Sequence, residues 1–330
     1  MKILVSLAAV GVLFLVGLLG GTGTVPEAIF GVILPYAAVA VLLGGLAYRV
    51  LSWANAPVPF RITTTCGQEK SLPWIKQAKL DNPSSAAGVV GRMLLEVLCF
   101  RSLLRDVKAR LLEGGKLVYG TSLWLWLGAL AFHWSMLVIL LRHLRLFTSP
   151  APSWVGFLAK MDGFLDAGVP VFYITSVVFL AALAYLLLRR LLDPQVRYIS
   201  LAEDYFLLFL LLGIGLSGFC LRHVAKTDVA AITELAAGLA QFRPALPASV
   251  APLFFGHLFL VCVLAAYLPF SKVVHLAGVF LSPTRNLANN NRMARHVNPW
   301  DYPVKTHSYE AYENEWREKM KAAGVPVDKE

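Results

Sequence analysis

Charged residues are scarce in this chain of 330 residues: they make up 15% of it, whereas 57% of the residues are hydrophobic. The mean hydropathy is +0.63. Soluble domains carry about 25% charged residues, so this composition excludes an ordinary soluble protein. Apolar stretches recur through most of the sequence, which a single signal peptide does not explain. We therefore expect a membrane protein whose first apolar stretch is a retained anchor.

Cysteine is also rare. The four cysteines form no C-x-x-C, C-x-x-C-H or ferredoxin-like spacing, which argues against covalently attached c-type haem and against an iron–sulfur cluster in this chain. Cys220 and Cys262 lie within apolar runs and are interpreted as small buried hydrophobic residues. The net charge is +10, but the basic residues form short blocks beside the apolar stretches and no amphipathic face, which argues against nucleic-acid binding.

Six apolar stretches are long enough to cross a membrane as helices. A helix rises about 1.5 Å per residue and needs about 20 residues to cross a hydrocarbon layer of about 30 Å. Backbone groups in lipid must be satisfied within the segment, and runs of this length fit helices rather than barrel strands. The sequence thus predicts an all-α polytopic membrane helix bundle with spans at residues 3–19, 28–48, 117–141, 167–188, 205–221 and 248–281.

The positions of lysine and arginine predict the orientation. Residues 51–116 contain ten basic residues against five acidic ones, and basic loops are retained in the cytoplasm. Arg189 and Arg190 place the connection after the fourth span on the same side, as do the basic residues of the tail. We expect a protein of the cytoplasmic (inner) membrane with both termini in the cytoplasm. Arg142 and Arg145 fall on the outer side and need another explanation.

The same pattern divides the chain into four parts. A helix predicted at 89–111 mixes apolar and basic residues; it lies on the membrane surface, docks a partner, or packs as a solvated helix on the bundle. A charged helix is predicted at 309–323. The parts are two N-terminal transmembrane helices (1–50), a cytoplasmic connecting segment (51–116), a four-helix membrane domain (117–281) and a soluble cytoplasmic tail (282–330).

Histidines are the candidate functional residues. His133 and His143 lie on the third span, and His257 and His275 lie on the sixth. Ionisable groups within a membrane helix cost free energy, so these residues need a role. Two histidines on each of two helices suit a bundle that holds two haems, each iron between one imidazole from either helix. Packing histidines and a proton path remain open alternatives.

The histidine spacings do not match. His133 and His143 are ten residues apart, or about 15 Å along a helix, whereas the 18 residues between His257 and His275 correspond to about 27 Å. Helix tilt, ligands that reach a ring from opposite faces, or Pro269 between the latter two histidines can absorb the difference, because proline kinks or breaks a helix. His223 ends the fifth span at the membrane boundary, where a histidine costs little, and we do not expect it to be a ligand.

Three arginines lie at the predicted outer boundary near His143: Arg142, Arg145 and Arg222. The planar guanidinium suits carboxylates, so these residues are candidates for contacts with haem propionates. This role accounts for basic residues that break the orientation pattern. Ordinary interfacial arginines that extend to the headgroups are the alternative.

Two resemblances follow from these motifs. The His-x9-His and His-x17-His pairs resemble the gamma subunit of respiratory nitrate reductase, a di-haem b quinol oxidase, over residues 117–281. Other segments resemble the DsrM family, the cytochrome b subunits of the DsrMKJOP complexes of dissimilatory sulfur metabolism, over nearly the whole chain. The segments that carry this second resemblance are residues 59–68, 71–75, 91–93, 100–103, 281–286 and 295–300.

The resemblance implies a ligand assignment. His133 would pair with His275 near the cytoplasm and His143 with His257 near the outer face, which gives two haem b groups. Menaquinone would be the substrate, and Lys160 is the candidate for its site. One departure from the nitrate reductase group is the additional transmembrane segment at the N-terminus.

The resemblance also implies partners. These are a cytoplasmic iron–sulfur subunit with a heterodisulfide-reductase-like catalytic domain (DsrK-like), a multihaem cytochrome c, a periplasmic iron–sulfur protein and a second membrane subunit. The predicted function is electron transfer between menaquinone or menaquinol and the iron–sulfur partner, as a subunit rather than a self-contained enzyme. The alternative is a membrane anchor or a transporter in which the histidines pack or relay protons.

Overall fold

The computed structural model describes residues 1–56, 78–105, 107–166, 168, 170–247, 250–288 and 305–329. They form two units. The first consists of Met1–Leu51 and Gly91–Phe280, and the second consists of Ser52–Val90 and Leu281–Glu330. The first unit contains the membrane bundle and the candidate site. The segments 59–68, 71–75 and 295–300, which carry part of the DsrM resemblance, lie outside the described residues.

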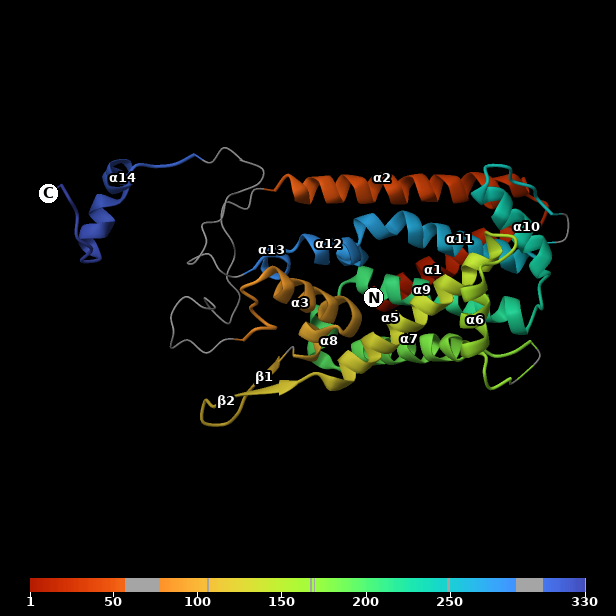
Figure 1. Ribbon diagram of the computed structural model, residues 1–330, viewed down its shortest axis with the longest axis horizontal. Coiled ribbons are helices and arrows are strands. Elements are labelled where there is room, and N and C mark those ends of the chain that lie inside the picture. Colours follow the sequence, from red (N-terminus) through yellow and green to blue (C-terminus); the bar gives the residue numbers. More distant parts are fainter. Residues whose placement is uncertain are drawn as a thin grey trace. The chain divides into compact units, whose positions relative to one another are not determined.

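Six helices of the described chain are long and apolar enough to cross a membrane. Figure 1 shows them running side by side. This confirms the predicted all-α membrane bundle. The helices are α1 (Lys2–Leu18), which a 3₁₀ turn extends to Gly21; α2 (Leu34–Ala54), which follows a π-helical turn at Ile29–Ile33; α5 (Leu123–His143); α7 (Ile174–Leu192); α9 (Ala202–His223); and α11 (Pro252–Tyr267).

Shorter elements lie at the two ends of the bundle. At one end are α6 (Ser153–Asp162) and α10 (Val229–Ala240), and at the other are α8 (Pro194–Ile199) and a two-stranded hairpin (Figure 1). The sequence analysis did not predict α10. The remaining elements are α3 (Ala86–Cys99), α4 (Arg101–Leu104), α12 (His275–Leu281), α13 (Pro283–Asn286), α14 (Tyr309–Ala322) and 3₁₀ turns at Leu144–Leu146, Leu268–Phe270 and Lys272–Val274.

The predicted helix over residues 89–111 is partly wrong. Helix α3 ends at Cys99, because Phe100 adopts the left-handed conformation with φ of 49°. After the single turn of α4 the chain forms β1 (Val107–Leu111), which pairs antiparallel with β2 (Leu117–Thr121). The third membrane helix accordingly begins at Leu123 and not at 117.

Two glycines allow this hairpin. Gly114 and Gly115, in the turn between the strands, have φ of 82° and 77°, a region in which a side chain on Cβ is strained. The amide of Leu112 donates to the carbonyl of Lys116 at 2.9 Å, which closes the turn. Helical periodicity in the preceding residues is therefore overridden by a turn that only the two glycines favour.

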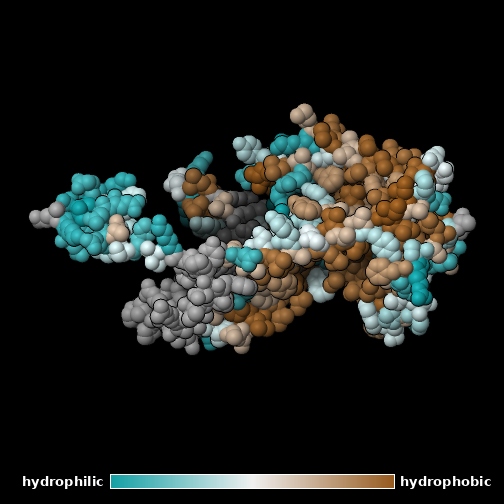
Figure 2. All heavy atoms as spheres, turned by 90° about the horizontal axis from the view of Figure 1, so that it is seen from above, coloured by the Kyte–Doolittle hydropathy of each residue, from teal (hydrophilic) through white to brown (hydrophobic). Residues whose placement is uncertain are grey.

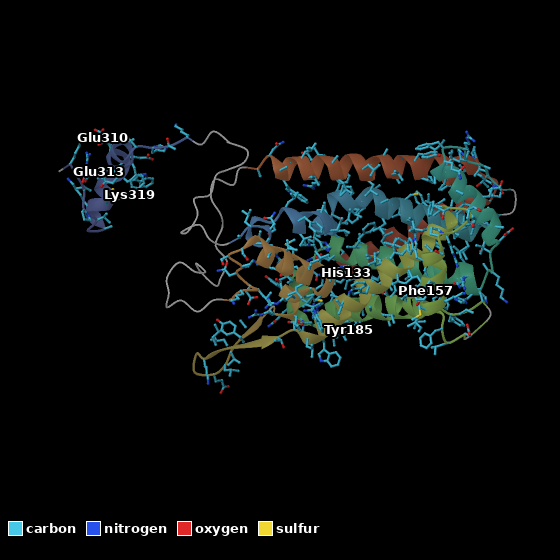
Figure 3. All side chains as sticks on the ribbon, viewed as in Figure 1. His133, Phe157, Tyr185, Glu310, Glu313 and Lys319 are labelled. Atoms are coloured by element: carbon cyan, nitrogen blue, oxygen red, sulfur yellow. The ribbon has the colours of Figure 1, made fainter. Side chains whose placement is uncertain are left out.

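Close packing joins α5 to α7. A Cβ on Gly128 of α5 would lie 2.6 Å from the ring of Tyr185 on α7, so only glycine permits this approach (Figure 3). Phe132, Phe179 and Leu183 form the buried core between the two helices. The position of the histidine-bearing helix α5 is thereby fixed against α7.

The N-terminal helix α1 packs against α9 and α11. A Cβ on Gly17 would lie 2.9 Å from the Cα of Gly256, so small residues allow the two backbones to approach closely. The Ser6 hydroxyl donates to the carbonyl of Ala202 at 2.8 Å. Gly256 directly precedes His257, and α1 therefore supports the helix that carries this candidate ligand.

The tail helix predicted at 309–323 is confirmed as α14. Its central carboxylate, Glu313, is 1% exposed and accepts hydrogen bonds from the backbone amides of Asp328 and Lys329. These two amides, with Arg317, lower the pKa of Glu313. The last residues of the chain thus fold back onto a mainly hydrophilic helix, whereas apolar residues cover much of the bundle (Figure 2).

Candidate functional site

His133 on α5 and His275 at the start of α12 lie beside each other. Their ring centroids are 6.2 Å apart, and the ring planes are inclined at 79°. Figure 3 labels His133 within the bundle. Phe100 and Phe132 each pack edge-on against the His133 ring with centroids 4.8 Å away. We call His133 and His275 the first histidine pair.

A break in the sixth span brings His275 to this position. Helix α11 ends at Tyr267, and a 3₁₀ turn that contains Pro269 follows. Ser271 is then extended, with φ of −113° and ψ of 174°, before the chain turns again and α12 begins at His275. The distance of about 27 Å expected for 18 residues applies only to a continuous helix. Of the two expected effects of Pro269, a kink or a break, the structure shows a break.

His143 and His257 form the second histidine pair. His143 is the last residue of α5 and His257 lies near the start of α11, and a charge on His143 acts on His257. The structure therefore gives a ring separation for His133 with His275 and an electrostatic interaction for His143 with His257. These are the two combinations that the family resemblance implies, and the ligand roles stay a prediction.

All four rings are held through Nδ1. In each case the neighbouring group accepts, so Nδ1 carries the proton and the Nε2 lone pair is left free for a metal. Three acceptors are backbone carbonyls and one is the Ser217 hydroxyl, which itself donates to the carbonyl of Gly213 at 2.7 Å. The distances are 2.7 Å from His133 to Ala129, 2.7 Å from His143 to Ile139, 2.9 Å from His257 to Ser217 and 2.8 Å from His275 to Lys272.

The spacing of the first histidine pair fits a shared metal ion. Two metal–imidazole bonds of about 2 Å on opposite sides of a metal, with roughly 1 Å from each nitrogen to its ring centre, separate the centres by about 6 Å. The observed separation is 6.2 Å. No group of three or more metal-binding side chains occurs in the part of the chain that the structure describes. Two imidazoles suit a haem iron, whose porphyrin supplies the remaining ligands.

The three arginines converge on one side chain, Tyr173. The guanidinium of Arg142 lies 3.7 Å from the ring centre and that of Arg222 lies 4.4 Å from it, while Arg145 donates to the hydroxyl at 3.4 Å. Burial alone would raise the pKa of the Tyr173 phenol, but Arg222, Arg145 and Arg142 outweigh it and lower the pKa. The cluster is a concentrated positive region beside the second histidine pair.

Arg142 already has an anionic partner. Its Nε lies 2.9 Å from Asp162 Oδ2, and both side chains are almost fully buried. Asp162 also accepts from the backbone amide of Thr175 at 2.8 Å, at the first turn of α7. The carboxylate therefore ties α6 and α7 to the residue that directly precedes His143.

Comparison with known proteins identifies the family. Residues 118–296, more than half of the chain, match the family described as nitrate reductase gamma subunit. The chain belongs to this family. A relative from Archaeoglobus fulgidus, named Hdr-like menaquinol oxidoreductase cytochrome b-like subunit, is 44% identical over 280 residues and covers 83% of both chains. A protein of the same name from Archaeoglobus profundus is 42% identical over 275 residues, with 81% of both chains covered.

These findings confirm both resemblances inferred from the sequence motifs. The family match covers α5 to α12, which contain all four histidines of the two pairs. The relatives extend the similarity beyond this gamma subunit region, because each aligns with more than four-fifths of the chain. Helix α1, which lies before the family match, packs directly on the histidine-bearing helix α11.

The remaining two candidates are His223 and Lys160. The ring of His223 stacks on Phe172 with centroids 4.1 Å apart and planes 10° apart, and it also contacts Phe219. This packing agrees with the expectation that His223 is not a ligand, which stays a prediction. Lys160 is exposed in the last turn of α6, two residues before Asp162.

Sequence reasoning missed four residues of the candidate site: Ser217, Gly218, Asp162 and Tyr173. A Cβ on Gly218 would lie 3.1 Å from Cε1 of His257, so this glycine provides room for the ring. Ser217 is a polar residue within an apolar span, which is a usable signal. Its partner lies 40 residues away, however, and is known only from the packing of α9 against α11.

Proposed function

We propose that this chain is a di-haem b membrane subunit that transfers electrons between menaquinol or menaquinone and a cytoplasmic iron–sulfur partner. The main support is the first histidine pair: two rings 6.2 Å apart, both with Nδ1 engaged and Nε2 available. The names of the two relatives, which combine a cytochrome b-like subunit with menaquinol oxidoreductase, support the same function.

The four histidines would be the axial ligands. His133 and His275 would hold one haem b, and His143 and His257 would hold the other. Haem supplies single-electron transfer when bound, and its potential depends on the axial ligands and their hydrogen bonds. The Nδ1 hydrogen bonds fix the tautomer and orientation of each ring and increase its basicity, as is usual for metal-bound histidine.

The arginine cluster would bind haem propionates or the quinone headgroup. Arg142 is neutralised by Asp162, so Arg145 and Arg222 are the better candidates for a propionate. Lys160 lies on α6, which Asp162 ties to the segment before His143, and it would contribute to a menaquinone site at this end of the bundle. In the proposed orientation this end faces outward, and both termini are cytoplasmic.

The connecting segment 51–116 and the tail 282–330 would dock a cytoplasmic iron–sulfur subunit of the DsrK type. The word Hdr-like in the relatives' names is consistent with a heterodisulfide-reductase-like partner. A multihaem cytochrome c, a periplasmic iron–sulfur protein and a second membrane subunit would complete a complex of dissimilatory sulfur metabolism. This chain would transfer electrons, and substrate chemistry would take place in the partner.

A reduced-minus-oxidised optical spectrum of the purified full-length chain tests this proposal. We expect a b-type α band, two haems per chain by extraction, and reduction of the haem by a menaquinol analogue. The His223→Ala variant serves as a control and should keep the wild-type spectrum. A purified chain that folds without haem would contradict the proposal and favour a membrane anchor or a transporter.

A further inference from the structure

The segment that carries His275 is held differently from the other ligand positions. His133 and His143 donate from Nδ1 to backbone carbonyls of the same continuous helix, α5. His275 follows the break at Ser271, and its acceptor is the carbonyl of Lys272 in a single 3₁₀ turn. Neither this turn nor α12 has a buried residue. Core packing therefore does little to fix the carbonyl that orients the His275 ring.

The side chain of Lys272 provides an attachment instead. Its Nζ lies 2.9 Å from Glu203 Oε1 and 2.9 Å from Asp204 Oδ1, both in the first turn of α9. The lysine ammonium is charged at neutral pH, so these are ion pairs as well as hydrogen bonds. One residue thus joins α9 through its side chain and His275 through its backbone.

Asp204 is itself held by two helices. Its Oδ2 accepts from the backbone amide of Leu201 at 2.8 Å and lies 3.5 Å from Arg190 on α7. Its side chain is 11% exposed, against 62% for Lys272. The Asp204 carboxylate is consequently held in place by its own contacts, and the more exposed Lys272 side chain binds to it.

The other side of the break is also attached to the bundle. Arg49 on α2 donates from Nε to the carbonyl of Pro269 at 3.0 Å. A Cβ on Gly45 would lie 2.7 Å from Pro269, so α2 approaches the break closely. The segment between Pro269 and His275 is therefore fastened at both ends by charged side chains from other helices.

We propose that Lys272 is a positioning residue, whose ion pairs with Asp204 and Glu203 hold the carbonyl that orients His275 toward His133. This inference rests on the proposed haem-binding role of the first histidine pair. An isolated surface ion pair contributes little to stability. Here the ion pairs fix the position of the Lys272 backbone, and the carbonyl of Lys272 is the hydrogen-bond acceptor for the His275 ring.

The test uses the full-length chain and four variants. Lys272→Met removes the charge but keeps the backbone carbonyl and most of the side-chain length. Asp204→Asn removes the carboxylate charge and keeps an acceptor for the Leu201 amide. Lys272→Arg keeps the charge. Lys116→Met, in the exposed hairpin turn, is the matched control. The readouts are haem content and the two low-spin electron paramagnetic resonance signals, assigned with the His133→Ala and His143→Ala variants.

We expect Lys272→Met and Asp204→Asn to lower the signal of the first histidine pair several-fold relative to that of the second. Lys272→Arg should restore most of it, and Lys116→Met should have no effect. Unchanged signals in Lys272→Met, equal loss of both signals, or selective loss at the second pair would each overturn the proposal. A wild-type chain without haem would refute the proposed function first, and this is visible before any variant is made.

Discussion

Ser217→Ala is the most informative single substitution at the candidate site. The hydroxyl of Ser217 accepts from Nδ1 of His257 at 2.9 Å. The other three histidines use backbone carbonyls, which a substitution cannot remove. Loss of a hydrogen-bond partner behind a metal ligand typically lowers metal affinity 10- to 100-fold. This corresponds to roughly 1.4–2.7 kcal/mol, at about 1.36 kcal/mol for each factor of ten.

The expected result is selective. Haem at the second histidine pair should bind 10- to 100-fold more weakly and lose part of its low-spin signal, whereas haem at the first pair should be unchanged. Ser135→Ala is the matched control, because Ser135 is a buried serine on α5 whose hydroxyl donates to the carbonyl of Phe132 at 3.0 Å. Haem content and redox titration of both variants measure the effect. Equal behaviour of the two variants would refute the reasoning.

Three further predictions concern the ligands, the orientation and the tail. His133→Ala and His275→Ala should give one phenotype, and His143→Ala and His257→Ala another, because an iron that loses one of two imidazoles becomes high-spin or is released with its haem; losses that pair His133 with His257 would contradict the assignment. Reporter fusions at Ala87 and at the C-terminus should be cytoplasmic and one at Gly238 should be external, so an external signal at Ala87 would reverse the orientation. Deletion of residues 286–330 should leave haem binding intact and release the iron–sulfur partner during purification, and an intact complex would assign the tail another role.

Hydropathy was enough to predict the membrane helices. The cost of ionisable groups in lipid singled out the four histidines, whose role as ligands stays a prediction. Six spans were expected, and six helices of the described chain have the required length and composition. The helix ends were less predictable. Leu117–Thr121 is apolar and reads as the start of a span, yet it pairs with Val107–Leu111 because Gly114 and Gly115 close a turn. The glycine turn between the two strands therefore determines where the third membrane helix begins.

The pairing of the histidines could not be derived from spacing. The arithmetic assumes that His257 and His275 belong to one straight helix, and it then gives separations that do not match those on α5. Pro269 indicated a change of direction, but the extended conformation of Ser271 is a property of the folded chain. The contacts of Arg142 with Asp162 and Tyr173 join segments that are separate in sequence, and hydropathy carries no information about them.

The supports of the four rings differ in a way that bears on function. The hydrogen bonds of His133 and His143 lie within the continuous helix α5, and that of His275 joins α12 to the 3₁₀ turn directly before it. The bond from His257 to Ser217 joins two helices, α11 and α9, and α1 packs on both of them. The hydrogen bond that orients His257 therefore depends on how α9 and α11 pack against each other and against α1. The N-terminal helix lies outside the matched gamma subunit region, yet it is one of the elements on which the second histidine pair depends.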